Sequence, residues 1–346
     1  MDAVLETLGR AAATGLIPSE GSVLLAVSGG ADSMGLLYGA AEVAATTSWR
    51  LTVGHVHHGW PERRRDADRD LASVADHARR LGLPFASRRC DARRAAAELG
   101  LSPEAGARHV RYAALAEMAR DAGAPWIATA HQRDDVLESY LLARERRGGL
   151  AGLAGPRRRR DDGVVRPLLG VRRSEIVRFL AARGVPFRRD ASNGDLRLAR
   201  NRVRRELSGL SEEQLAALWE EVDRLGRRRD RVELRFAEEL APALRFAADL
   251  ATADAGALSA APPELRRIAL ERLAAPFARA GGPPFSGRER EQIVRLLGAG
   301  ADFRFEAGRR IRFVRRGGIL TVGPRALRTR GRGRVYDSPH APMSPL

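Results

Sequence analysis

The segment LLAVSGGADSMGLL, residues 24–37, carries the side chains of this chain that are best suited to holding a phosphate. Its adjacent glycines let the backbone approach an anion closely, and a helix that follows would point free N–H groups at that anion. Two serine hydroxyls add further donors. The predicted phosphate-binding residues are Ser28, Gly29, Gly30, Ala31, Asp32 and Ser33.

Asp32 is the unusual member of this loop, because a carboxylate beside phosphates is repulsive unless a cation lies between them. Its presence predicts a Mg²⁺ ion bound by Asp32 and by the phosphates. The loop is not the P-loop of common NTPases, since that loop ends in lysine and the 346-residue chain contains none. A glycine turn that serves only the geometry of the chain is the alternative, and the carboxylate and two hydroxyls argue against it.

The loop follows a short apolar run, and the N-terminal half alternates such runs with helical patterns. Apolar runs of this length are typical of buried parallel strands, which predicts an α/β fold with a Rossmann-like parallel sheet and helices on both faces. The predicted strands are residues 22–27, 51–57, 84–89 and 125–131, and the predicted helices are residues 34–45, 66–81, 103–122 and 134–144.

Three polar segments come directly after predicted strands: residues 28–33, 55–59 and 131–135. In an open parallel sheet, ligands bind beyond the carboxyl ends of the strands, at the point where the strand order reverses. We therefore expect these segments to meet at one edge of the sheet and to form a single site.

The pattern changes after about residue 148. Residues 148–163 are Gly-rich and then basic, which predicts a mobile surface loop, and VVRPLL is expected to form an edge strand that ends at Pro167. The later predicted elements are helices at 172–183, 211–249 and 287–298 and strands at 302–306, 310–315 and 318–322.

All 60 basic residues are arginines, against 43 Asp plus Glu, and the formal net charge is +17. Codon bias would explain arginine in place of lysine, but it does not explain the excess of positive charge. Arginines pair with phosphates and release counterions, so the charge predicts a nucleic-acid partner, with a merely solubilising surface as the alternative.

The single cysteine, Cys90, excludes an intramolecular disulfide, a CxxC metal site and a two-cysteine relay, and is most simply a small buried residue. The N-terminal residues do not resemble a signal peptide, and no apolar run approaches the ~20 residues of a membrane span. We expect a soluble protein of a reducing compartment, the cytoplasm.

The SGGxDS loop resembles the PP-loop, the signature of the N-type ATP pyrophosphatase family. In that family the loop holds the pyrophosphate of ATP while a substrate oxygen attacks the α-phosphate, which gives an adenylated substrate and pyrophosphate. The resemblance implies ATP and Mg²⁺ as cofactors. It does not select a substrate, since the family includes synthetases of small molecules and enzymes that modify tRNA.

Further segments are similar to the tRNA(Ile)-lysidine synthetase family, in the same order along residues 22–206. PEAGARHVRY matches that family's E-x-x-A-R-x-x-R-Y pattern through Glu104, Ala107, Arg108, Arg111 and Tyr112. The other similar segments are HVHHGW (55–60), TAHQRDDVLES (129–139), RPLL (166–169), DASN (190–193) and RNRVR (200–204). Departures from the pattern include Gln132 in place of His, Val136 in place of Gln and Arg147 in place of Gly.

This resemblance implies a two-step reaction on the isoleucine tRNA with anticodon CAU. ATP adenylates the C2 oxygen of the wobble cytidine, and the ε-amine of free L-lysine then displaces AMP to give lysidine. The resemblance does not reveal how the enzyme distinguishes this tRNA from methionine tRNAs with the same anticodon. The oligomeric state is left open, with a homodimer as one option.

Two pairs of charged residues fit this chemistry. Asp135 and Glu138 lie at i and i+3 on one helix face, so both can point into one site, hold the ammonium groups of lysine and accept a proton from the amine. Arg108 and Arg111 have the same spacing and could stabilise charge on the α-phosphate. Asp134 can cap the helix instead, and a solvated helix face is the alternative for both pairs. With Asp32, the two pairs make up the predicted catalytic residues.

His58 and His131 are expected to contact the nucleotide, because each follows or ends a predicted strand and matches a histidine of the family. A zinc site that uses His55, His57 and His58 is the alternative, but adjacent strand residues face opposite ways and no acidic ligand follows in the loop.

The predicted organisation has four parts: residues 1–210 as the catalytic domain, 211–280 as a helical tRNA-binding or linking region, 281–326 as a small basic α+β module and 327–346 as a disordered basic tail. Two other functions stay open. One is a cysteine-poor tRNA thiolase of the same family, and the other is an RNA-binding protein without catalysis.

Overall fold

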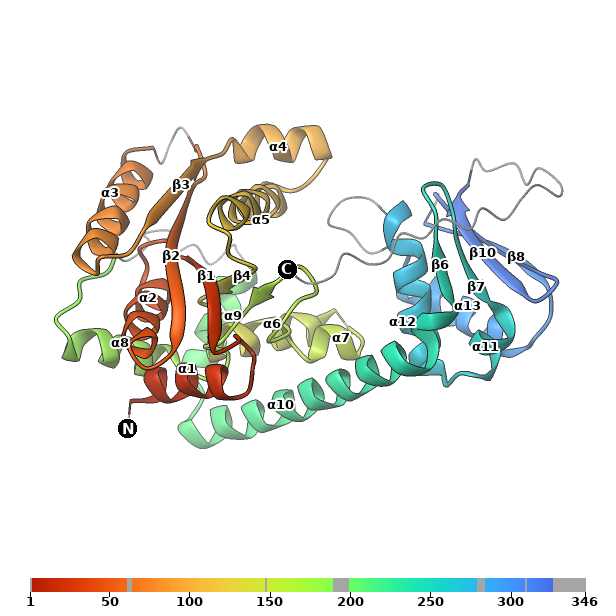
Figure 1. The fold of residues 1–346 in the computed structure, drawn as a ribbon. Coiled ribbons are helices and arrows are strands. Elements are labelled where there is room, and N and C mark those ends of the chain that lie inside the picture. The colour runs from red at the N-terminus through yellow and green to blue at the C-terminus, as the bar shows by residue number, and fades with distance from the viewer. Residues whose placement is uncertain are drawn as a thin grey trace. The chain divides into compact units, whose positions relative to one another are not determined.

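The computed structural model describes residues 2–60, 64–146, 148–188, 199–278, 284–308 and 310–325. The chain divides into two compact units, residues 1–226 and residues 227–341, and each unit contains a five-stranded sheet of its own (Figure 1). The predicted DASN segment, Arg147, Arg309 and the tail lie outside the described residues.

The first unit is an α/β fold with a parallel sheet in the order β3-β2-β1-β4-β5, as the sequence predicts. Its strands are β1 (Glu20–Ala26), β2 (Ser48–His57), β3 (Phe85–Arg89), β4 (Trp126–Thr129) and β5 (Val164–Val165). Its helices are α1 (Ala3–Ala13), α2 (Ala31–Ala44), α3 (Arg64–Arg80), α4 (Ala92–Leu99), α5 (Pro103–Asp121), α6 (Arg133–Glu145), α7 (Leu150–Leu153), α8 (Arg173–Ala182), α9 (Ala199–Ser208) and the first part of α10 (Glu212–Arg235).

Helices cover both faces of this sheet because successive strand residues point to opposite sides. Val23 and Leu25 of β1 belong to a core shared with α1, α2, α3 and α8, whereas Leu24 packs with Leu115 of α5 on the other face. Figure 1 shows the two layers, with α2 and α8 on one side of the sheet and α5 on the other. The two cores hold the carboxyl ends of the central strands in fixed positions.

The strand order reverses beside β1, because β2 and β3 follow on one side of it and β4 and β5 on the other. The loop after β1 and the helix after β4 therefore leave the sheet from adjacent strands. A reversal of this kind opens a crevice at the carboxyl ends of the two strands.

Residues 157–165 form a hairpin at the edge of the sheet, in a region where composition predicts a mobile surface loop over residues 148–163. Arg159 makes an antiparallel bridge with Val165, and the Arg166 N–H donates to the Arg158 carbonyl at 2.8 Å. Composition alone does not reveal this pairing, because the bonds are made by backbone groups that every residue carries.

Gly163 allows the hairpin to turn, since its φ is +79° and an added Cβ would lie 2.5 Å from the Pro125 carbonyl oxygen. The Arg160 N–H donates to the Val164 carbonyl at 2.9 Å and closes the turn. The edge strand β5 that follows contains two residues, fewer than predicted.

The second unit is an antiparallel sheet in the order β6-β7-β10-β9-β8. Its strands are β6 (Leu244–Phe246), β7 (Ala251–Asp254), β8 (Phe303–Ala307), β9 (Ile311–Arg316) and β10 (Ile319–Pro324). Its helical elements are α11 (Ala255–Ala260), α12 (Pro263–Ala274), α13 (Gly287–Gly298) and the short turns η3 (Phe236–Leu240), η4 (Ala241–Ala243) and η5 (Ala275–Phe277).

Strands β6 and β7 correct the predicted division at residue 281. Both lie in the range that the sequence predicts to be helical, yet β7 pairs with β10 and β6 pairs with β7. Their three and four residues are too short to give a clear alternating pattern, which explains why the sequence does not reveal them.

Alternate residues of β9 face opposite sides of the second sheet. Arg315 is 8% exposed and donates to the Ser259 hydroxyl at 2.9 Å and to the Leu297 carbonyl at 3.3 Å. Arg316 is exposed. Arg315 therefore stabilises the unit, whereas Arg316, the next residue of the strand, is open to solvent.

Candidate active site

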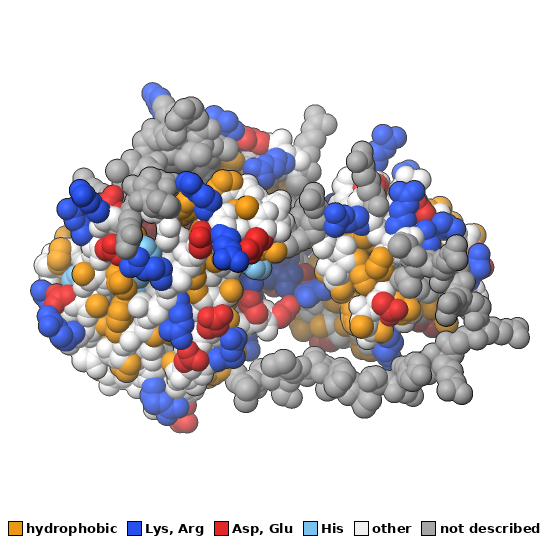
Figure 2. Space-filling view, turned by 90° about the horizontal axis from the view of Figure 1, so that it is seen from above, with side chains coloured by type: hydrophobic (Ala, Val, Ile, Leu, Met, Phe, Trp, Pro, Cys, Tyr) orange, Lys and Arg blue, Asp and Glu red, His pale blue; other side chains and the backbone are white. Residues whose placement is uncertain are grey.

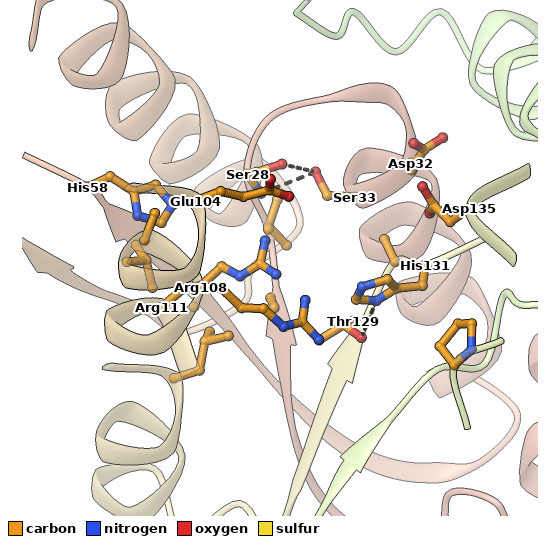
Figure 3. Close-up of a pocket in the computed structure, with 18 of the residues that line it drawn as sticks. Ser28, Asp32, Ser33, His58, Glu104, Arg108, Arg111, Thr129, His131 and Asp135 are labelled. Atoms are coloured by element: carbon orange, nitrogen blue, oxygen red, sulfur yellow. Dashed lines mark hydrogen bonds between the residues drawn. The ribbon is translucent and has the colours of Figure 1, made fainter. Parts of the chain in front are cut away.

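The loop after β1 is closed by hydrogen bonds of Ser33. The Ser33 hydroxyl accepts from the Ser28 N–H at 3.1 Å and donates to the Gly30 carbonyl at 2.9 Å, and the two serine hydroxyls lie 3.2 Å apart (Figure 3). Gly30 precedes α2 and offers no side-chain cap to it. The first turn of α2 is therefore suited to binding an anion.

Helix α2 begins at Ala31, which is earlier than the predicted start at Met34. Asp32 and Ser33 consequently lie in its first turn rather than in the loop. The small side chain of Ala31 is buried.

Gly29 has a φ of +88°, a conformation that side chains with a Cβ rarely adopt. Its carbonyl accepts from the Arg188 N–H at 3.0 Å. The Arg188 guanidinium in turn donates to the Asp66 carbonyl at 2.8 Å and lies 2.7 Å from an Asp70 carboxylate oxygen, both on α3. Two distant segments, the one that contains Arg188 and helix α3, thus help to fix the shape of the loop.

Asp32 is bound on one side and unsatisfied on the other. Its Oδ2 accepts from the Arg173 guanidinium at 2.8 Å, and its buried Oδ1 has no hydrogen-bond partner among the described residues. Burial raises the pKa of Asp32 to about 6; Arg173 opposes the shift, and the carboxylates of Asp135 and Asp134 add to it. A cation at Oδ1 would remove the cost of ionising this group.

These features fit one protein ligand for Mg²⁺, which commonly takes one or two carboxylates and completes its shell with phosphate oxygens and water. The described residues contain no group of three His, Cys, Asp or Glu side chains that could hold a metal. His55 and His57 lie against the Val27 carbonyl and Asp68 at 2.8 and 3.3 Å, which gives these buried rings a structural role.

A cavity of about 520 Å³ lies at the carboxyl ends of the strands, within the usual size for small-ligand sites. All three polar segments contribute to it, as expected. Its lining residues are Ala26, Val27, Ser28, Asp32, Ser33, Gly54, Val56, His58, Glu104, Ala107, Arg108, Arg111, Leu115, Thr129, Ala130, His131, Asp135, Glu138, Ser139 and Pro156. The predicted residues Gly29, Gly30 and Ala31 belong to the adjoining loop and helix start.

The two predicted carboxylates differ in their surroundings. Asp135 Oδ2 accepts from the Gln132 N–H at 3.1 Å in a capping box, so Gln132 caps the helix, a role that the sequence offers to Asp134 as an alternative. Glu138 is 4% exposed, and its Oε1 accepts from Arg204 Nε of α9 at 2.6 Å. Both carboxylates line the cavity from α6.

Arg108 and Arg111 extend from α5 into the cavity on the side opposite Asp32 (Figure 3). Their guanidinium carbons lie 4.9 and 5.3 Å from the centre of the Tyr112 ring. The cavity therefore has a cationic wall that faces a wall containing Asp32 and Asp135.

His58 is neutral at neutral pH, because burial and, to a smaller extent, the charge of Arg111 lower its pKa to about 4. Its Nδ1 is buried and has no hydrogen-bond partner among the described residues. His131 Nδ1 lies 3.0 Å from the Thr129 hydroxyl (Figure 3). Both rings line the cavity, and His58 has a nitrogen that can bond a ligand.

Sequence reasoning missed the partners of the carboxylates. Arg173 comes from α8, far along the chain from Asp32, and no local spacing connects the two. Arg204 lies in the RNRVR segment, which the family resemblance does indicate, but its pairing with Glu138 depends on the contact between α6 and α9.

None of the helices in the described ranges combines the length and the apolar character that crossing a membrane requires.

A sequence family described as the PP-loop domain matches residues 6–210. The tRNA(Ile)-lysidine synthase of Ralstonia nicotianae is 34% identical over 298 residues, which cover 85% of this chain and 58% of the relative. The synthase of the same name from Thermus thermophilus is 38% identical over 255 residues, which cover 72% and 48%. The chain spans about half to three-fifths of the length of these curated relatives.

One solved structure with a similar fold is a U34-tRNA thiolase, NcsA, from Methanococcus maripaludis with its 4Fe-4S cluster. The TM-score is 0.54 and the identity is 14%, over 65% of this chain and 78% of the other. At this identity the similarity concerns the fold alone.

Proposed function

The chain belongs to the PP-loop domain family, and from this membership we propose that it forms lysidine in the isoleucine tRNA with anticodon CAU. In the proposed reaction, ATP adenylates the C2 oxygen of the wobble cytidine and pyrophosphate leaves. The ε-amine of free lysine then displaces AMP. The relatives described above carry the name tRNA(Ile)-lysidine synthase, which supports this choice of substrate.

The observation that carries the proposal is the composition of the cavity. One space of about 520 Å³ is lined by the hydroxyls of the phosphate loop, two arginines and four carboxylates, which are those of Asp32, Glu104, Asp135 and Glu138. These are the groups that an adenylation followed by attack of an amine requires.

The proposed first step uses the loop and the cationic wall. The N–H groups of the first turn of α2 and the hydroxyls of Ser28 and Ser33 bind the departing pyrophosphate. Arg108 and Arg111 stabilise the charge that develops on the α-phosphate. His58 Nδ1 bonds the nucleotide.

Asp32 would hold Mg²⁺, and the bound ion would neutralise the phosphate charge beside this carboxylate. Arg173 donates to Oδ2 of Asp32 at 2.8 Å, so Oδ1 is the oxygen that would bind the ion.

The proposed second step uses α6. Asp135 and Glu138 bind the ammonium groups of lysine, and one of the two accepts the proton that the ε-amine loses on attack. Arg204 holds Glu138 in place, since the two side chains share a 2.6 Å hydrogen bond.

The test combines the full chain with ATP, Mg²⁺, radiolabelled lysine and an unmodified CAU-anticodon isoleucine tRNA. Label is expected in the tRNA, and a transcript whose wobble cytidine is replaced by uridine should take up none. Absence of label, with an active lysidine synthase assayed alongside, would refute the proposal.

A tRNA thiolase is the second candidate, because the thiolase named above shares the fold. The single cysteine of this chain, Cys90, is half-buried, and burial raises the pKa of its thiol, which makes it a poor sulfur carrier. Product formation that depends on a sulfur donor and not on lysine would favour this candidate. A protein without catalysis would bind the tRNA and release no pyrophosphate.

A further inference from the structure

Four arginines surround one tyrosine behind the cationic wall of the cavity. The guanidinium carbons of Arg108, Arg111 and Arg160 lie 4.9, 5.3 and 4.7 Å from the centre of the Tyr112 ring. Arg166 interacts electrostatically with the same tyrosine. We call Arg108, Arg111, Arg160 and Arg166 the arginine cluster.

The cluster concentrates positive charge in a half-buried place. Arg166 is 2% exposed, and its pKa is lowered by burial and further by its neighbours Arg160 and Arg108. Its Nη1 donates to the Arg157 carbonyl at 2.6 Å, whereas its buried Nε has no hydrogen-bond partner among the described residues. Like charges at this spacing repel, and an anion beside them would relieve the repulsion.

The hairpin of residues 157–165 extends the cluster to the surface. Successive strand residues alternate in direction, so Arg158 lies on the same side of the hairpin as Arg160. Arg159 lies on the other side, with its guanidinium carbon 4.2 Å from the centre of the Trp126 ring. Arg158 is exposed, and Arg160 bonds Asp162.

We propose that Arg160 and Arg158 bind backbone phosphates of the RNA strand next to the nucleotide that reacts in the cavity. The hairpin is then an RNA-binding element, continuous with the cationic wall that Arg108 and Arg111 form. This inference rests on the proposed function, because it takes tRNA as the substrate.

RNA fits this surface better than the phosphates of ATP do. Arg158 and Arg160 lie outside the lining of the cavity, whereas Pro156 at the base of the hairpin belongs to it. An RNA strand that leaves the cavity beside Pro156 would pass Arg158 and Arg160, whereas a mononucleotide bound by the lining residues alone would not contact them. On the face seen in Figure 2, arginine and acidic side chains are interspersed over the first unit.

The experiment compares the full chain with the double variant Arg158→Gln/Arg160→Gln. Binding of the CAU-anticodon tRNA is measured by fluorescence anisotropy between 50 and 200 mM salt, and the KM for ATP is measured in the same preparations. Loss of two phosphate contacts should weaken binding about tenfold at physiological salt and reduce the salt slope by about two. The KM for ATP should stay within about twofold.

Two matched variants serve as controls. Arg159→Gln removes a charge from the opposite side of the same hairpin, and Arg79→Gln/Arg80→Gln removes two exposed charges from the end of α3. Both should bind tRNA nearly as the parent chain does. If the double hairpin variant fails to fold by circular dichroism, the exposed Arg158→Gln replaces it, with a slope change of about one.

An unchanged slope in the hairpin variant would overturn the inference, as would an equal loss in either control or a raised KM for ATP with normal RNA binding. The proposed function fails separately, by absence of lysine incorporation in the parent chain. A parent chain that incorporates lysine and a hairpin variant that binds tRNA normally would refute only the role of the hairpin.

Discussion

Single side chains determine the chemistry that the cavity can support, and Asp32 is the most informative of them. Its residue type predicts a cation, because a carboxylate beside phosphates is repulsive unless a cation lies between them. Its bond to Arg173 could not be predicted, since that bond depends on how α2 and α8 pack. The same limit applies to Glu138, whose partner Arg204 comes from α9.

Asp32→Asn should abolish pyrophosphate release and leave tRNA binding within about twofold of the parent chain. The variant removes the anionic ligand of Mg²⁺ and keeps the shape of the side chain. Release of pyrophosphate is measured with a coupled assay and tRNA binding by anisotropy. Substantial turnover in the variant would contradict a metal-binding role for Asp32.

Stability should depend on pH through the same residue. The pKa of Asp32 is about 6 in the folded chain and 3.8 in the reference state, so the folded chain holds the proton more tightly. The free energy of unfolding should therefore fall by up to about 3 kcal/mol as the pH rises from about 4 to about 6. It should stay at this lower value above pH 6.

Melting temperatures of the parent chain and of Asp32→Asn, measured from pH 4 to pH 8, check this expectation. The parent should lose stability relative to the variant over this range, and Mg²⁺ at pH 7 should recover the difference in the parent alone. Parallel curves for the two proteins would show that Asp32 does not titrate in this range.

Glu138→Gln should raise the KM for lysine by about tenfold or more, because a charge-assisted bond to an ammonium contributes about 1.5–3 kcal/mol. Pyrophosphate release in the absence of lysine should persist. The matched control is Glu145→Gln, whose carboxylate bonds Arg202 at 2.8 Å between the same two helices but on the exposed surface. An equal change in both variants would mean that Glu138 acts only through helix packing.

Secondary-structure elements place these side chains, and most elements of the first unit could be predicted from alternating apolar runs. The start of α2 was predicted three residues late, because small residues such as Ala31 give no apolar signal. The hairpin of residues 157–165 was missed because backbone bonds and Gly163 define it, and arginine composition resembles that of a solvated loop.

Gly35→Ala tests how packing between α2 and α8 supports the site. A Cβ on Gly35 would lie 2.5 Å from Ile176 Cγ2, so the Ile176 side chain or the helices must shift. We expect a loss of about 1–3 kcal/mol of stability and a weaker bond between Arg173 and Asp32. Urea unfolding gives the stability, and the Mg²⁺ dependence of pyrophosphate release reports on Asp32.

The double variant Gly35→Ala/Ile176→Ala removes the clashing methyl group and should recover part of the loss. A coupling energy near zero in this double-mutant cycle would show that the side chains at the two positions do not clash.

At the scale of the whole molecule, the excess of positive charge predicts an RNA partner, but it does not indicate which arginines would contact the RNA. Of the three arginines in β9, Arg315 donates to the Ser259 hydroxyl and the Leu297 carbonyl inside the second unit, and Arg316 is exposed. Arg316→Glu should weaken tRNA binding and lower the salt slope by about one, with an unchanged melting temperature.

Arg315→Gln should instead lower stability by about 1–3 kcal/mol, because it leaves buried acceptors unsatisfied. Equal effects on the salt slope would contradict this division.

The order of strands also has a consequence for the synthesis of the protein. β1 pairs with β4, so the crevice cannot form until Trp126, about one hundred residues after its partner Val23, has been synthesised. The hydrogen bond between Arg173 and Asp32 can form only later still, once α8 has been synthesised. A ribosome-bound chain therefore carries its phosphate loop from the start but gains an ATP-competent cavity only after α8 has emerged. Nucleotide binding by nascent chains of increasing length would thus report when the first unit completes its fold.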